Sequence, residues 1–158
     1  MLGAEDEFLL LLVHPAFSKH LTPREMGLHR VLDVLTWLRT QPFDWQTVRE
    51  RLDAEGVSTA GWAALRWAGL LAAKYAPEKF DGMASDLRPG RLRAAWLGHW
   101  LEGNLSERTA GAHGARLLAF SLFLHDTPGD AVRALTGRRR ARRRQADDLA
   151  AFGELLGQ

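Results

Sequence analysis

Two histidines near the start of the chain are the first residues whose type suits metal or acid-base chemistry. His14 and His20 are six residues apart, and Pro15 lies between them. Histidines that bind one metal from a single helix are spaced so that both rings leave the same face, and this pair is not. Ordered histidines usually satisfy hydrogen bonds in a core or at a surface, so the spacing predicts no metal site.

A second polar group surrounds Asp33, which lies among apolar residues. His29 precedes it by four residues, Arg30 precedes it by three, and Trp37 follows it by four. At these spacings all four side chains lie on one flank of a helix. The group suits either a contact to a substrate or a local ion pair that anchors two helices. The second interpretation is favoured, because partnered polar groups in helix bundles are commonly structural.

The dipeptide Asp44-Trp45 has the composition of a helix start. An aspartate at the cap accepts hydrogen bonds from the first turn, and the tryptophan is expected to pack back onto the bundle. Together these patterns give one set of candidate residues. The candidate substrate or partner pocket consists of His14, His20, His29, Asp33, Trp37, Asp44 and Trp45.

Most catalytic motifs are absent from the sequence. There is no cysteine, which removes disulfides, thiolate nucleophiles and zinc fingers, and which is compatible with a reducing cytoplasm. No HExxH metal motif, phosphate-binding P-loop, dinucleotide GxGxxG or serine elbow GxSxG occurs. The sequence therefore predicts no catalytic, cofactor-binding or metal-binding residue.

Positive charge is concentrated near the C-terminus. The whole chain has 21 basic and 19 acidic residues, but residues 1–132 hold 14 basic and 16 acidic groups, a formal charge of −2. The candidate polyanion-binding residues are Arg133, Arg138, Arg139, Arg140, Arg142, Arg143 and Arg144. Such a block can neutralise several phosphates of a nucleic acid. Asp147 and Asp148 follow at once, so a solvated helix face with internal ion pairs is the other interpretation.

Helical signals dominate the chain, because isoleucine is absent and Ala, Leu and Arg are abundant. A first helix is expected from about Glu5 to Val13, ending near His14-Pro15, since proline interrupts a helix. "TPRE", at 22–25, has a cap, a proline and a glutamate that start a second helix. Its predicted buried stripe is Leu28, Val31, Leu32, Leu35 and Leu38.

Further turn and cap residues divide the rest of the chain into short helices. The expected segments are one capped by Asp44 and closed at Gly56, one capped by Ser58 that runs to about Tyr75, one that starts near Pro89, one over 111–126, and a last group that starts at Thr127. Leu92, Trp96 and Trp100 are expected on one face of their helix. The prediction is an all-α single-domain bundle of seven or eight short helices over 1–136, with a basic helix at 137–158 packed on the same domain.

The N-terminal apolar run "FLLLLV" does not predict a membrane segment. It is too short to span a bilayer, and it follows three acidic residues instead of a basic region. We therefore expect a cytoplasmic protein without a membrane partner.

The order of these segments resembles the helical C-terminal region of a bacterial family of putative nucleotidyltransferases. The segments that carry the resemblance are "EDEFLLLLVHPAFSKH", "LHRVLDVLTWLRTQPFDWQTVRERLDAEGV" and "WAALRWAGLLAAKYAP", and the matching positions are His14, His20, Leu32, Asp33, Asp44, Trp45, Leu65 and Pro77. The chain departs from the family pattern at Val31-Leu32, where a pair with tryptophan is expected.

The resemblance implies an accessory domain that is not active by itself. Nucleotidyl transfer needs a phosphate loop and clustered carboxylates that hold Mg²⁺ against a nucleoside triphosphate, and the sequence has neither. By itself the chain is thus expected to bind an acceptor substrate or a protein partner such as a nucleotidyltransferase domain. The alternatives are sequence-independent nucleic-acid binding through Arg138–Arg144 and an oligomerising scaffold that uses Leu149, Phe152, Leu155 and Leu156.

Overall fold

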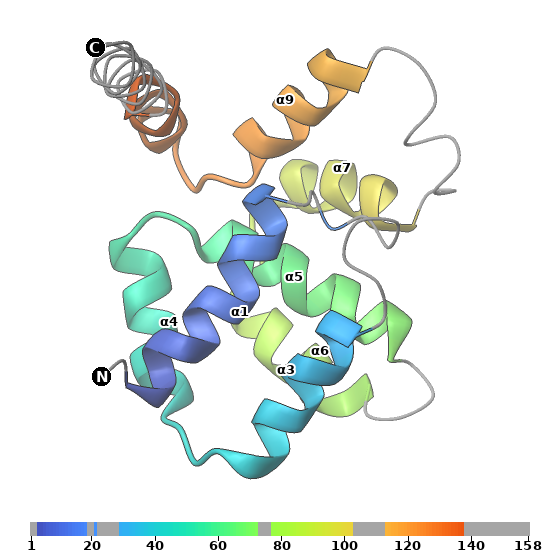
Figure 1. Cartoon of the computed structure of the whole chain (residues 1–158). Coiled ribbons are helices and arrows are strands. Elements are labelled where there is room, and N and C mark those ends of the chain that lie inside the picture. Colours follow the sequence, from blue (N-terminus) through green and yellow to red (C-terminus); the bar gives the residue numbers. More distant parts are fainter. Residues whose placement is uncertain (1–2, 19–20, 22–28, 73–76, 103–112, 138–158) are drawn as a thin grey trace, which may run out of the picture. The chain divides into compact units, whose positions relative to one another are not determined.

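The computed structural model describes residues 3–18, 21, 29–72, 77–102 and 113–137. The chain divides into two compact units, Met1–Asp126 and Thr127–Gln158. The helices of the first unit are α1 (Ala4–Ser18), α3 (His29–Thr40), α4 (Trp45–Ala54), α5 (Ser58–Leu71), α6 (Pro77–Asp86), α7 (Arg91–Glu102) and α9 (His113–Phe123) (Figure 1). Residues 128–137 of the second unit are also helical, and the described ranges contain no strand. The predicted all-α bundle is confirmed. The predicted basic helix at 137–158 lies almost entirely outside these ranges and stays a prediction.

The first helix does not end at Pro15, as the sequence predicts. Helix α1 continues to Ser18 with Pro15 buried inside it. An interior proline removes one backbone hydrogen bond. Phe8, Leu12 and Ala16 are all almost fully buried, at the four-residue spacing of a single helix face, on either side of that proline. Continued burial of this face offsets the lost hydrogen bond.

Helix α3 is rotated about its axis, so that its buried face differs from the predicted stripe of leucines and valine. Leu32 is 59% exposed, whereas Val34 and Trp37 are buried and Leu35 and Leu38 are partly buried. The side chains of residues 28 and 31 lie outside the described part of the chain. Trp37 explains the rotation, because its ring stacks on Phe8 of α1 with centroids 4.6 Å apart. Packing of this large aromatic side chain outweighs the burial of one leucine.

Helix α4 begins and ends as predicted. Asp44 is the N-cap, and its carboxylate accepts a hydrogen bond from the backbone N–H of Gln46. Gly56 closes the segment with a φ of 66°, a left-handed conformation that glycine adopts without steric cost.

Helix α5 is the centre of the first unit, in contact with α1, α4, α6 and α7 (Figure 1). It is buried along almost its whole length from Thr59 to Gly69. Gly61 allows this close packing, since a Cβ atom at this position would lie 3.0 Å from Leu52 and 3.1 Å from Leu87. The helix ends at Leu71, before the predicted end near Tyr75, and residues 73–76 are not among those described.

The cap of α5 comes from a distant part of the chain and not from Ser58, as the sequence predicts. The carboxylate of Asp126 accepts hydrogen bonds of 2.7 Å from the backbone N–H groups of Ser58 and Thr59. The backbone of Asp126 is itself held, because its N–H donates to the carbonyl of Gly56 and its carbonyl accepts from Arg93. These bonds satisfy donors that every helix start leaves without an intrahelical partner.

Helix α6 was not expected from the sequence. It begins with Pro77, a residue favoured at the first helical position, and it buries Phe80 and Ala84. Leu87, just beyond its end, is buried as well. The proline and this apolar spacing are the signals that predict the helix in hindsight.

Helix α7 buries Trp100 but exposes the other two residues of the face that Leu92, Trp96 and Trp100 share. Leu92 is 89% exposed and Trp96 is 36% exposed, while Leu97 and Trp100 are buried. Stacked rings connect α7 to α9. Trp96 stacks on Phe123 and Trp100 stacks on Phe120, with centroids 4.6 and 4.8 Å apart. Each aromatic pair adds roughly 0.5–1.5 kcal/mol beyond the area it buries.

The helical stretch of the second unit starts as the sequence predicts. The Thr127 hydroxyl accepts a hydrogen bond from the Asp130 N–H, and the Asp130 carboxylate accepts one of 3.1 Å from the Thr127 N–H. This reciprocal pair is a capping box. Among the described helices of both units, none combines the length and apolar character that crossing a bilayer requires.

Candidate functional site

Two of the predicted pocket residues meet in an apolar groove between α1 and α3. The groove has a volume of about 500 Å³ and is lined by Glu7, Leu10, Leu11, His14, Pro15 and Trp37. His14 reaches it because the helix continues through Pro15, which keeps this turn of α1 opposite α3. We call this cavity the α1–α3 groove.

Trp37, which lines the α1–α3 groove, carries a buried polar group without a partner among the described residues. Its ring is 8% exposed, stacks on Phe8 and meets the edge of Phe43 at 4.9 Å. Its indole N–H is buried and has no hydrogen-bond acceptor among the described residues. A buried donor of this kind costs free energy unless an acceptor satisfies it.

The other candidate pocket residues do not line the α1–α3 groove. Asp33 is exposed on α3, and Asp44 and Trp45 lie at the start of α4. His20 and the side chain of His29 fall outside the described part of the chain. The structure therefore places His14 and Trp37 in the α1–α3 groove, whereas Asp33, Asp44 and Trp45 do not line it.

Asp44 and Trp45 have the structural roles that the sequence predicts for them. The hydroxyl of Thr47 donates a 2.7 Å hydrogen bond to the Asp44 carboxylate. This bond, with the backbone N–H of Gln46, lowers the pKa of Asp44 below its ordinary value. Trp45 is partly buried against the core, and its indole N–H donates a 2.8 Å hydrogen bond to Asp86.

Arg133 is the one member of the predicted polyanion cluster that lies in the described part of the chain. Its side chain is 78% exposed and forms an ion pair with Asp130. The hydroxyl of Thr127 is the main cause that lowers the pKa of Asp130; burial opposes this effect, and Arg133 lowers the pKa further. Residues 138–144 are outside the described ranges, so their role stays a prediction.

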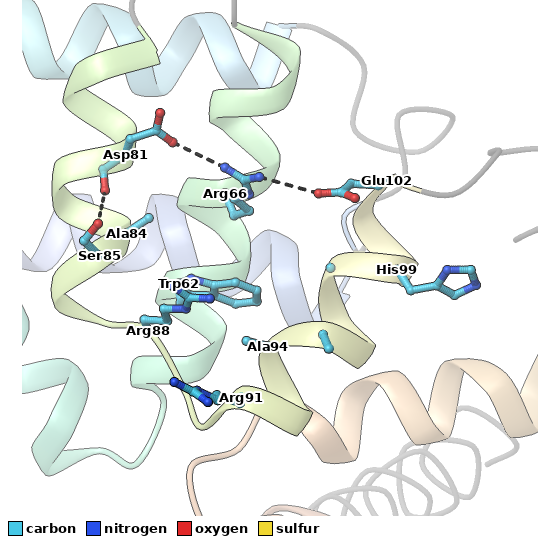
Figure 2. A pocket seen from close by; sticks show the side chains of 12 residues that line it. Trp62, Arg66, Asp81, Ala84, Ser85, Arg88, Arg91, Ala94, His99 and Glu102 are labelled. Carbon is cyan, nitrogen blue, oxygen red and sulfur yellow. Dashed lines mark hydrogen bonds and ion pairs between the residues drawn. The ribbon is translucent and has the colours of Figure 1, made fainter.

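A second cavity, which the sequence did not predict, lies between α5, α6 and α7 and holds about 510 Å³ (Figure 2). Its charged lining residues are Arg66, Asp81, Arg88, Arg91 and Glu102, and His99 lines it as well. Its uncharged lining includes Trp62 and several small residues, among them Ala84, Ala94 and Gly98. We call it the arginine cleft.

The two carboxylates of the arginine cleft both face one arginine. Arg66 contacts Asp81 and Glu102, each at 3.5 Å, so that it bridges α6 and α7 (Figure 2). All three side chains are 40–58% exposed, and ion pairs of this kind contribute little to stability. Arg88 and Arg91 have no carboxylate partner within the residues that the structure describes.

Comparison with known proteins adds no family to this description. No family model, no curated protein and no solved structure matches the chain. The likeness to the C-terminal region of nucleotidyltransferases therefore stays a prediction from the sequence.

Proposed function

We propose that this chain is a non-catalytic helical binding domain that receives a protein partner in the α1–α3 groove. The observation that carries the proposal is Trp37, which lines an apolar groove and whose buried indole N–H has no acceptor among the described residues. A partner that inserts an apolar side chain and offers a carbonyl oxygen satisfies both features. Apolar grooves with a few polar groups are common binding sites.

The exposure of the groove residues supports a macromolecular partner. Leu10 is 50% exposed although it lies on a helix whose other face is fully buried. Glu7 and His14 lie at spacings of three and four residues from it on the same helix, and both line the groove. Apolar contact at the centre with polar groups around it is the usual composition of a protein interface.

The resemblance seen in the sequence suggests what the partner is. If it holds, the groove docks a nucleotidyltransferase catalytic domain, and that domain supplies the Mg²⁺ and nucleoside triphosphate sites. The present chain then contributes binding and positioning of the acceptor substrate or of the catalytic domain.

The absence of cysteine makes a site-specific crosslinking test possible. Leu10→Cys carries a benzophenone maleimide into the groove, and Leu92→Cys carries the same label on α7, where the native side chain is 89% exposed and lies outside the groove. Each labelled protein is irradiated in a lysate of cells that naturally make the chain. A protein crosslinked from position 10 but not from position 92 is the expected result.

Competition then tests the indole donor. Excess unlabelled wild-type chain should abolish the crosslink, and excess Trp37→Phe should compete less well, because it keeps an aromatic ring but lacks the N–H. The crosslinked protein is identified by mass spectrometry and its affinity for the purified chain is measured by calorimetry. Equal crosslinking from both positions, or none from position 10, contradicts the proposal.

Nucleic-acid binding is the second candidate function. It rests on the highly exposed side chain of Arg133, which lies on the helical stretch that leads into the arginine-rich segment 138–144. Binding of duplex DNA, single-stranded DNA and structured RNA is measured against salt concentration, with the six arginines of 138–144 changed to Gln in a variant. Salt-dependent binding that the variant loses supports this candidate, and equal binding by both proteins refutes it.

A further inference from the structure

The arginine cleft concentrates unpaired positive charge at one end. Arg88 follows the last turn of α6 and Arg91 is the first residue of α7, so both lie where these helices connect (Figure 2). Neither guanidinium has a hydrogen-bond or ion-pair partner among the residues that the structure describes. By contrast, the neighbouring Arg93 donates to the carbonyl of Asp126 and to the hydroxyl of Thr59. Two arginines thus remain available to an anion.

The acidic residues of the cleft do not cancel this charge. Asp81 and Glu102 both face Arg66, in the half of the cleft farther from the α6–α7 connection (Figure 2). His99 lines the cleft but points away from it in the same view. The end formed by Arg88 and Arg91 therefore carries two positive charges, whereas the other end, with one arginine and two carboxylates, has a formal charge of −1.

The uncharged lining leaves room for a small molecule. Ala84, Ala94 and Gly98 carry little or no side chain, and a Cβ atom on Gly98 would meet nothing within 4 Å. The volume of about 510 Å³ lies in the range of small-molecule sites. Trp62, which is 6% exposed, adds an apolar surface.

From this distribution of charge and space, we propose that the arginine cleft binds a small phosphorylated molecule, with the phosphate on Arg88 and Arg91 and the remainder over the small residues of α6 and α7. Phosphate suits this end because its three oxygens accept from two guanidinium groups at once, and arginine binds it in bidentate fashion. The inference is independent of the α1–α3 groove, which lies on other helices.

Calorimetric titration of the full chain with inorganic pyrophosphate and with inorganic phosphate, at constant ionic strength, tests the proposal. The double variant Arg88→Gln, Arg91→Gln should raise the Kd for pyrophosphate at least about tenfold. The control Arg39→Gln, Arg51→Gln removes the same charge from residues outside the cleft and should change the Kd less than about threefold. Binding that both double variants weaken equally reflects overall charge and overturns the proposal.

A second variant tests whether pyrophosphate binds in the arginine cleft without changing the charge of the protein. Gly98→Gln places a side chain in open space of the cleft and should also raise the Kd at least about tenfold. Thermal unfolding of each variant, followed by circular dichroism, verifies that it is folded. The proposal fails if the wild-type chain does not bind pyrophosphate, or if folded Gly98→Gln binds it as tightly as wild type. The labelled Leu10→Cys protein should bind pyrophosphate normally, which separates this site from the proposed partner groove.

Discussion

Removal of the Asp126 carboxylate should destabilise the first unit more than removal of any ordinary surface aspartate. The carboxylate accepts hydrogen bonds of 2.7 Å from two backbone N–H groups at the start of α5, the most buried helix of the described chain. In Asp126→Ala these two donors lose their acceptor. Arg93 keeps its bond, because it donates to the backbone carbonyl of residue 126. The variant therefore isolates the contribution of the carboxylate.

The expected loss of stability follows from the two hydrogen bonds that Asp126→Ala removes. Loss of a helix cap costs about 0.5–2 kcal/mol, and each hydrogen bond to a charged group contributes about 1.5–3 kcal/mol. Because the two bonds share one carboxylate and water reaches the partly buried site, we expect Asp126→Ala to lower the free energy of unfolding by about 2–4 kcal/mol. A loss of about 3 kcal/mol corresponds to a decrease in Tm of about 10 °C.

The assay is urea denaturation followed by circular dichroism, with two comparison variants. Asp126→Asn retains one acceptor oxygen but loses the charge, so its stability should lie between those of wild type and Asp126→Ala. Asp53→Ala removes an exposed aspartate of α4 and should change the unfolding free energy by less than about 0.5 kcal/mol. A loss below about 1 kcal/mol for Asp126→Ala, or an equal loss for Asp53→Ala, refutes the tertiary cap as a major stabilising feature.

Two further predictions follow from the caps and packing of the first unit. The pKa of Asp44 is lowered in the folded state, first by Thr47, so its stabilising effect exists at neutral pH and is lost as the pH falls through that lowered value. Asp44→Asn should accordingly show a smaller loss of Tm than wild type on acidification below the usual aspartate range, and an equal loss would contradict this. Gly61→Val should lower the unfolding free energy in urea by about 1–3 kcal/mol, because its Cβ would already lie 3.0 Å from Leu52 and 3.1 Å from Leu87. Unchanged stability would mean that these leucines move aside freely.

Two of the six residues that line the proposed partner site could be predicted from the sequence, but the arginine cleft could not. His14 and Trp37 were candidates because of their types and their positions on helices, and both line the α1–α3 groove. Arg66, Asp81 and Glu102 come from three helices, one of which the sequence did not predict. Arg66 is separated in sequence by 15 residues from Asp81 and by 36 residues from Glu102. No local spacing signals such a cluster.

The sequence by itself determined the helical class and several helix ends. Asp44 and the pair Thr127 and Asp130 form the caps that their spacing predicts, and Gly56 closes a helix in the left-handed conformation. These features depend on bonds between residues at most four positions apart and on the absence of a glycine side chain. A short window of sequence contains all the groups involved.

The tertiary structure decided which helix faces are buried and which distant groups meet. Pro15 remains inside α1, Leu32 is exposed on α3, and Asp126 caps a helix that begins 68 residues earlier. Each outcome depends on how a helix is rotated about its axis and on what packs against it. The free energy gained by burying an aromatic face or by satisfying a distant N–H group exceeds the local conformational preference of one proline or leucine. This gain arises only when the helices pack against one another, so a short window of sequence does not contain it.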